Sequence, residues 1–151
     1  MRNIKLTIEY DGSRYQGWTR LGKDESGNTI SNKITEVLKK MTGEDDLELF
    51  CGCRTEDGVH AYAQIANFRT SCSISTQNIK HYLNRYLPMD IATIEVEEVP
   101  ERFHAQLNAT SKTYVYRMTI DDVPSVFDRK YTYHCYRIPD KRLLQQAAGE
   151  L

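Results

Sequence analysis

The sequence lacks any long apolar run, and no stretch approaches the roughly 18 consecutive apolar residues that a membrane-spanning helix needs. It also lacks an excess of charge, because 20 Lys and Arg oppose 21 Asp and Glu for a net charge of −1. Proline is scarce, at 4 of 151 residues, while 40% of the residues are hydrophobic. These values exclude a disordered or collagen-like chain. Without a bulk positive field, any polyanion must be bound by a local patch.

The first residues alternate polar and apolar side chains and lack the apolar core of a secretory signal. We therefore expect a cytoplasmic location and reduced thiols. The short gap in Cys51-Gly-Cys53 does not suit a zinc knuckle, and no matching pair follows, so we expect no structural metal. The cysteines are Cys51, Cys53, Cys72 and Cys135.

Hydrophobic periodicity predicts alternating strands and helices. Period-two patterns indicate strands, and stripes of 3.6-residue spacing indicate helices. The order through Val99 is βαββαβ, which is typical of an α+β ferredoxin-like sandwich, with an antiparallel sheet and both helices on one face. The other face is then open as a platform. The predicted strands cover about 3–10, 47–53, 61–68 and 91–99, and the predicted helices about 30–42 and from Ser75 or Thr76 to before Pro88.

The pattern after this sandwich predicts the beginning of a second, similar module. Alternating Tyr and aliphatic residues predict a strand at 114–120, and a helix begins near Pro139. That helix stops at the chain end with no glycine or cap after Leu151, so we expect the chain to stop inside an element. The predicted division is a domain over 1–108 and an incomplete one over 109–151.

The densest polar cluster runs from Cys53 to Ala61. Because residues i and i+2 of a strand face the same side, Arg54 and Glu56 can pair, whereas Asp57 points elsewhere unless the turn rotates it. Such a pair is either a surface ion pair worth about 0–1 kcal/mol, or a carboxylate kept ionised by a guanidinium and able to act on a sugar carbon. Residue types alone favour the surface ion pair.

Other candidates are individually weak. His60 near a strand end can contact phosphate, but such a histidine more often makes a structural hydrogen bond. Tyr114 shares a strand face with a second tyrosine, and these rings either stack on a base, worth about 1–3 kcal/mol, or belong to a core. Arg14 and Arg20 flank Trp18 in a pattern that suits phosphate contacts and stacking, with solvated loop charges as the alternative.

Together, five ordered blocks resemble the tRNA pseudouridine synthase A (TruA) family. The resemblance covers essentially the whole chain and corresponds to about the first half of the usual family length. The blocks are Tyr10-Asp-Gly-Ser-Arg-Tyr-Gln-Gly-Trp18, Arg54-Thr-Glu-Asp-Gly-Val-His-Ala61, Asn84 with Leu87-Pro88 and Asp90-Ile91-Ala92, Phe103-His-Ala105, and Ala109-Thr with Lys112-Thr-Tyr-Val-Tyr116.

The resemblance implies isomerisation of uridine to pseudouridine in the anticodon stem-loop region of tRNA. It implies a homodimer when the protein is full length, and no metal or organic cofactor. The family's catalytic Asp follows Arg-Thr, so its position is Glu56 here, its salt-bridge partner is Arg54 and the active-site tyrosine is Tyr114. Asp57 takes the catalytic role only if the loop register slides by one. Because the missing half completes the usual site, these 151 residues alone are expected to be a poor enzyme.

One departure from the family pattern supports a second hypothesis. Glu56 carries its carboxylate one methylene farther from the backbone than Asp, and a misplacement of about 1 Å can cost roughly 10²-fold in rate. The alternative is therefore a catalytically impaired paralogue that uses the same sheet as an RNA-binding module. A ferredoxin-like domain with a non-nucleic partner is a third interpretation, and it leaves the ordered blocks unexplained.

Overall fold

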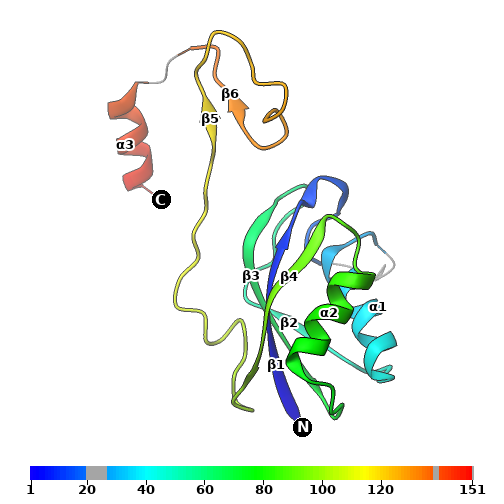
Figure 1. Ribbon diagram of the computed structural model, residues 1–151. Coiled ribbons are helices and arrows are strands. Elements are labelled where there is room, and N and C mark those ends of the chain that lie inside the picture. Colours follow the sequence, from blue (N-terminus) through cyan, green and yellow to red (C-terminus); the bar gives the residue numbers. More distant parts are fainter. Residues whose placement is uncertain (20–26, 138–139, 151) are drawn as a thin grey trace. The chain divides into compact units, whose positions relative to one another are not determined.

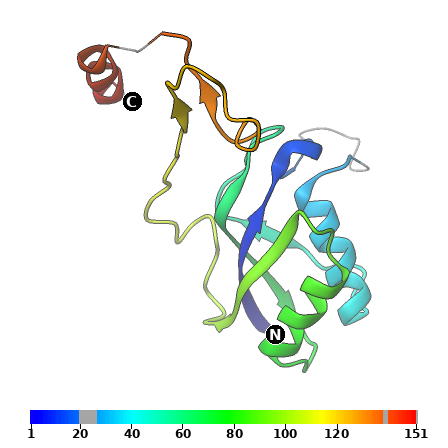
Figure 2. The same ribbon diagram turned by 45° about the horizontal axis from the view of Figure 1, so that its top comes forward.

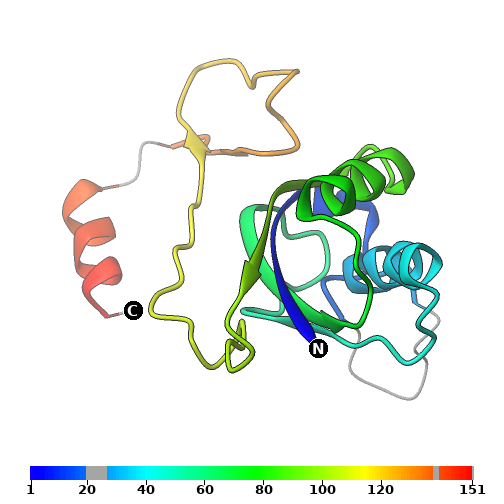
Figure 3. The same ribbon diagram turned by 60° about the horizontal axis from the view of Figure 1, so that its bottom comes forward.

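The computed structural model describes residues 1–19, 27–137 and 140–150. The chain divides into two units, Met1–Lys112 and Thr113–Leu151. The first unit is a four-stranded antiparallel sheet of order β2-β3-β1-β4, with two helices on one face (Figures 1 and 3). This is the predicted ferredoxin-like arrangement. Its elements are β1 (Arg2–Tyr10), the short 3₁₀ turn η1 (Gly12–Arg14), α1 (Ile30–Thr42), β2 (Leu49–Cys51), β3 (Ala61–Thr70), α2 (Thr76–Tyr86) and β4 (Ile91–Val99).

The central strand β1 carries the core of this unit. Its alternate residues Ile4, Leu6 and Ile8 are 0% exposed and belong to one cluster with the buried faces of α1 and α2. Burying an aliphatic side chain of this size stabilises the fold by about 1.5–3 kcal/mol. The period-two pattern that predicted the strand therefore also identified its buried face. The helical members of the cluster include Ile30, Ile34, Leu38, Ile79 and Leu83.

Both helices begin and end at chemically defined residues. The side-chain oxygens of Thr29 and Ser75 each accept a hydrogen bond from the backbone N–H three residues later, which satisfies a free donor of the first turn. Helix α1 ends at Gly43, whose φ of 74° is left-handed. Helix α2 ends two residues before Pro88, which favours extended backbone at the residue preceding it.

The sheet face opposite the helices is covered at one end by the segment that follows β4, residues 100–105, which we call the strap. The side-chain amide of Asn3 donates to the carbonyl oxygens of Pro100 and Phe103 at 3.1 and 2.8 Å. Asn67 donates to Asn3 Oδ1 at 2.9 Å and accepts from the Ala105 N–H at 2.8 Å. Both asparagines are 1% exposed. The predicted open platform is therefore interrupted where the strap crosses it.

The β1–β4 ladder contains an irregularity that α2 stabilises. Pairing of the two strands shifts register between Thr7 and Ile8. Beside it, Asn84 of α2 donates to the carbonyl oxygen of Thr93 at 2.9 Å and accepts from the Thr93 N–H at 2.8 Å. One helix side chain thus satisfies both backbone groups of a strand residue.

The second unit has little regular structure. It contains a two-stranded parallel ladder of β5 (Met118–Thr119) and β6 (Tyr133–His134), and helix α3 (Lys141–Gly149), which Asp140 caps (Figure 1). The strand predicted over 114–120 is wrong in length, because only two of its residues find a paired strand. The expected helix start at Pro139 lies outside the described residues. All described residues of this unit are at least partly exposed.

No helix in the described part of the chain has the length and apolar character to cross a membrane. The four cysteines are all free thiols.

Replacing Asn84 tests its bridge between α2 and β4. We expect Asn84→Ala to lower the free energy of unfolding by about 1–3 kcal/mol, because two backbone groups of Thr93 lose their partners. Urea denaturation measures this change. Asn78→Ala, on the exposed part of the same helix, is the matched control and should change stability by less than about 0.5 kcal/mol. Equal losses in the two variants would contradict the assigned role.

Candidate active site

Two loops meet at one end of the sheet, where β1 ends and β3 and β4 begin (Figures 1 and 2). We call residues 11–18, which follow β1, the β1 loop, and residues 52–60, between β2 and β3, the site loop. The Trp18 N–H donates to the carbonyl oxygen of Thr55 at 2.9 Å, and the Gly58 N–H donates to that of Tyr15 at 3.3 Å. Backbone hydrogen bonds in both directions therefore hold the two loops together.

Glycines of the β1 loop allow this close contact. A Cβ on Gly17 would lie 2.5 Å from the carbonyl oxygen of Thr55, and Gly17 has a left-handed φ of +71°. A Cβ on Gly12 would overlap the carbonyl group of Val59. Only a residue without a side chain fits at either position. The β1 loop is thus a backbone cradle for the site loop.

Thr55 anchors the middle of the site loop. Its hydroxyl lies 2.7 Å from the Tyr10 hydroxyl at the end of β1. The flanking residues Arg54 and Glu56 are both exposed. The inward-turned threonine leaves a guanidinium and a carboxylate at the surface, two positions apart.

A tight turn follows Glu56. The Val59 N–H donates to the Glu56 carbonyl oxygen at 3.2 Å, and Gly58 has a φ of +77°, as the third position of a type II turn requires. Asp57 is the exposed second residue of this turn. The site loop therefore presents two adjacent carboxylates to solvent.

The predicted ion pair between Arg54 and Glu56 is absent from the described residues. Strand β2 ends at Cys51, so the strand geometry that would align positions i and i+2 does not extend to these residues. The Arg54 guanidinium instead interacts with the Cys51 thiol. Burial raises the pKa of Cys51, although the Arg54 charge opposes that shift. The thiol is therefore protonated at neutral pH.

His60 closes the site loop against the start of the β1 loop. Its Nδ1 lies 3.0 Å from the Gly12 N–H and 3.0 Å from Asp11 Oδ1. The imidazole is partly buried by these contacts. This geometry agrees with a structural hydrogen-bonding role, which is the commoner role of a histidine near a strand end.

The β1 loop is itself held by Asp90, the residue before β4. Arg14 donates to Asp90 Oδ2 from Nε and Nη2 at 2.9 and 2.6 Å, and the Tyr15 hydroxyl donates to Oδ1 at 2.5 Å. Burial alone would raise the pKa of Asp90, but the hydrogen bonds from Tyr15 and Arg14 bring it below its ordinary value. Burial and the hydrogen bond to Asp90 raise the pKa of Tyr15 to about 12.

Comparison with known proteins identifies the chain. The family model described as tRNA pseudouridine synthase matches residues 6–108, which include both loops and Asp90. The chain belongs to the tRNA pseudouridine synthase A (TruA) family.

Similar relatives extend the match beyond the first unit. The chain is 48% identical over 134 residues to a tRNA pseudouridine synthase A of Bacillus sp. (strain KSM-64), covering 89% of this chain and 54% of the relative. It is 42% identical over 151 residues to a tRNA pseudouridine synthase A 2 of Bacillus anthracis, covering 100% and 60%. A Clostridium perfringens tRNA pseudouridine synthase A 2 is 46% identical over 147 residues, covering 97% and 59%. The chain thus spans 54–60% of the length of these curated relatives.

The structure brings together part of the site predicted from the family motifs. Arg54, Glu56 and Asp57 share the site loop, while Tyr114 lies in the second unit, where it is 66% exposed. Among the expected RNA contacts, Arg14 is 73% exposed in its side chain. Trp18 is 1% exposed and packs 6.0 Å from the Tyr10 ring, so it offers no free face for stacking. Arg20 lies outside the described residues.

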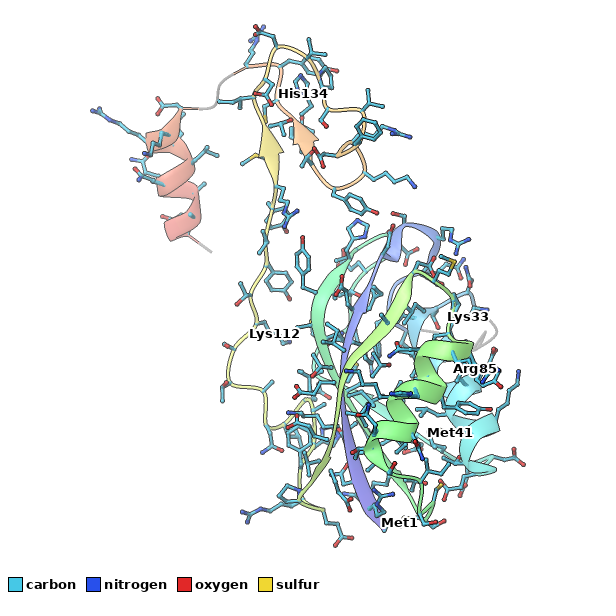
Figure 4. The ribbon with its side chains drawn as sticks, viewed as in Figure 1. Met1, Lys33, Met41, Arg85, Lys112 and His134 are labelled. Atoms are coloured by element: carbon cyan, nitrogen blue, oxygen red, sulfur yellow. The ribbon has the colours of Figure 1, made fainter. Side chains whose placement is uncertain are left out.

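Two open hollows of the first unit lie away from the site loop. An open hollow of about 720 Å³ is lined by α2 residues, including His81, Arg85 and Tyr86, and one of about 570 Å³ lies beside Arg69 and the strap. Figure 4 marks Arg85 on the helical layer. No group of three or more His, Cys, Asp or Glu in the described chain is placed to hold a metal ion. The site loop of the first unit presents its charged side chains on an open surface.

Sequence reasoning missed the contacts that fix the site loop. It assigned no role to Asp90, although this residue lies in one of the ordered blocks. The available signal was the pair of glycines at 12 and 17, which mark positions of close backbone approach.

Replacing Gly17 tests the cradle. Gly17→Ala should lower the free energy of unfolding by about 1–2 kcal/mol for its left-handed backbone, and by a further 1–3 kcal/mol, roughly, for the overlap with Thr55. Gly43→Ala is the matched control, because Gly43 has φ +74° with nothing within 4 Å of an added Cβ. It should show only the backbone cost. Urea denaturation compares the two, and equal losses would contradict the close contact.

Alkaline titration tests the environment of Tyr15. Because its pKa is about 12 in the folded protein against an ordinary value near 10, the unfolded chain ionises this tyrosine first. The stabilisation is complete below about pH 10 and is lost as pH rises toward 12. We expect Tyr15→Phe to flatten this decline in unfolding free energy, measured by denaturation at a series of pH values. A decline that is unchanged in the variant would contradict the assignment.

Proposed function

We propose that the chain supplies the first part of a tRNA pseudouridine synthase, with Glu56 as the catalytic carboxylate. The observation that carries the proposal is the exposed Glu56 side chain, at the family's Arg-Thr-Asp position, on a loop that two glycines and Tyr10 hold rigidly. Rigid placement of a charged group is what catalysis at a bound sugar requires. The proposed substrate is a uridine in the anticodon stem-loop region of tRNA.

The reaction needs few parts. The target uridine leaves the base stack, at a cost of a few kcal/mol, so that its ribose becomes accessible. The carboxylate assists cleavage of the C1′–N1 bond, either by attack on C1′ or by removal of the C2′ proton. The uracil then turns and C5 bonds to C1′. In the first route this breaks the bond between C1′ and the carboxylate oxygen, and in the second C2′ regains its proton from the carboxylic acid. The C5 proton leaves to solvent and N1 gains a proton. An ionised oxygen on the sugar face serves either route, as carboxylates do in glycosidases.

The proposal gives the other side chains supporting roles. Arg54 stabilises the charged carboxylate once the nucleotide has displaced water from the site loop. Tyr114 stacks on the displaced uracil or handles the proton at C5, and Asp57 replaces Glu56 only if the loop register shifts. Arg14 and Arg20 contact flanking phosphates, and His60 adds a contact through its outer edge.

The whole protein is proposed to act as a cytoplasmic homodimer. Its partner is tRNA, and neither a metal nor an organic cofactor enters the proposed reaction.

A catalytically impaired RNA-binding module is the second candidate function. Two observations favour it: the longer Glu56 side chain, and the missing ion pair between Arg54 and Glu56 in the described structure. An exposed, unaligned carboxylate is less well positioned than a paired one. Under this hypothesis the same loop and sheet bind tRNA without altering it.

Tritium release from tRNA labelled at C5 of uridine separates the two functions. The whole protein should release tritium. Glu56→Gln should lower the release rate by at least about 10³-fold, because the amide cannot act as a base or nucleophile, while tRNA affinity stays within a few-fold. Asp57→Asn is the control and should retain most activity. Binding without release by the unaltered protein would support the module instead.

Glu56→Asp examines the side-chain length directly. We expect faster tritium release, because the shorter side chain restores the family's geometry. A slower rate would show that neighbouring residues have adapted to glutamate.

A further inference from the structure

We infer that Asp90 is a positioning residue that holds the site loop in place through the β1 loop. The consequence for catalysis rests on the proposed function, whereas the consequence for the loop itself does not. Asp90 lies outside the site loop, and none of its contacts reaches Glu56 directly. Its action is indirect and runs through two sets of contacts.

The first set joins Asp90 to the β1 loop at three points. Its carboxylate accepts from Arg14 and from the Tyr15 hydroxyl, and its carbonyl oxygen accepts from the Asp11 N–H at 2.9 Å. Three successive parts of the loop therefore converge on one residue. Because the carboxylate receives charge-assisted and hydroxyl hydrogen bonds together, these contacts are stronger than ordinary neutral ones.

The second set joins the same part of the β1 loop to the site loop. The Tyr15 carbonyl oxygen accepts from the Gly58 N–H, and the Tyr15 N–H donates to the Gly12 carbonyl at 2.9 Å. Gly12 packs against the carbonyl of Val59, and its N–H contacts His60. Residues 58–60 therefore contact Gly12 and Tyr15. Asp90 helps to fix the position of both residues.

Tyr15 links the two sets through opposite ends of one residue. Tyr15 is 6% exposed and its hydroxyl binds Asp90, while its backbone binds Gly58. A buried ring has little rotational freedom, so a constraint on the hydroxyl is transmitted to the backbone. The turn that begins at Glu56 ends at Val59, and its last two residues contact Tyr15 and Gly12.

An ion pair at the other end of the same strands offers a comparison. Arg2 of β1 donates to Glu98 of β4 from Nε and Nη2 at 3.1 and 2.8 Å, which is the same arrangement as Arg14 and Asp90. Arg2 also donates to the carbonyl oxygens of Cys72 and Ile74, residues outside both loops. If Asp90 only added a surface ion pair, removing the Asp90 carboxylate and removing the Glu98 carboxylate would have the same effect on the site loop.

Hydrogen exchange of the 151-residue chain measures the loop without requiring activity. We expect Asp90→Ala to speed exchange of the Trp18 and Gly58 amides by at least tenfold, with the central amides of β1 unchanged. Tyr15→Phe should act in the same direction, and Asp90→Asn less strongly, because its amide oxygen still accepts from Tyr15. Glu98→Ala is the matched control and should leave both amides unaffected.

Tritium release by the whole protein measures the catalytic consequence. Asp90→Ala should lower kcat by roughly ten- to hundredfold, the scale expected for a catalytic group displaced by about 1 Å. The KM for tRNA should change by less than about threefold, since Arg14 keeps its charge. Asp90→Asn should recover part of kcat. Glu98→Ala should retain kcat even where its free energy of unfolding is equal to or lower than that of Asp90→Ala.

Different results overturn different statements. Unchanged exchange at Trp18 and Gly58 in Asp90→Ala, or equal effects of Asp90→Ala and Glu98→Ala, would overturn the positioning role. Faster exchange with unchanged kcat in an active protein would overturn its catalytic consequence. If the unaltered whole protein releases no tritium, the proposed function fails, and the exchange result still decides whether Asp90 holds the loop.

Discussion

The contact of one backbone with another, at Gly12 and Gly17, is the constraint on which the candidate site depends. Two loops distant in sequence approach each other more closely than any side chain would permit. Hydrogen bonds between main-chain groups then fix their relative position, and such bonds are short and geometrically restrictive. The backbone positions of the charged residues in the site loop are therefore fixed, although their side chains are exposed.

Exposure of the carboxylate has a physical meaning for the proposed chemistry. A solvated Glu56 is a weak nucleophile and base, because water stabilises its charge. A bound nucleotide would exclude that water and strengthen the attraction between Glu56 and a nearby guanidinium. The missing ion pair in the described structure is therefore compatible with a site that becomes aligned when RNA binds, as catalytic contacts often tighten in the complex.

Regular elements were predictable from sequence because local signals determine them. Helix α1 covers residues 30–42 as expected, since Thr29 caps its start and Gly43 ends it. The residues of the site loop were identified, but their alignment was not, because a strand pattern was extended past Cys51, where β2 ends. Trp18 was predicted to contact RNA because Arg14 and Arg20 flank it, yet tertiary packing buries it. The support from Asp90 involves residues about 75 positions apart, a separation over which periodicity carries no information.

The strap that crosses the sheet has a consequence for access to its surface. The Asn3 side-chain amide donates to two main-chain carbonyls of the strap, and Asn67 Oδ1 accepts from the Ala105 N–H, so the strap covers that end of the sheet. A macromolecule that approaches this face beside Asn3 and Asn67 meets the strap instead of the strands. Six residues that follow the last strand of the sheet thereby take part of this face away from direct contact with any partner.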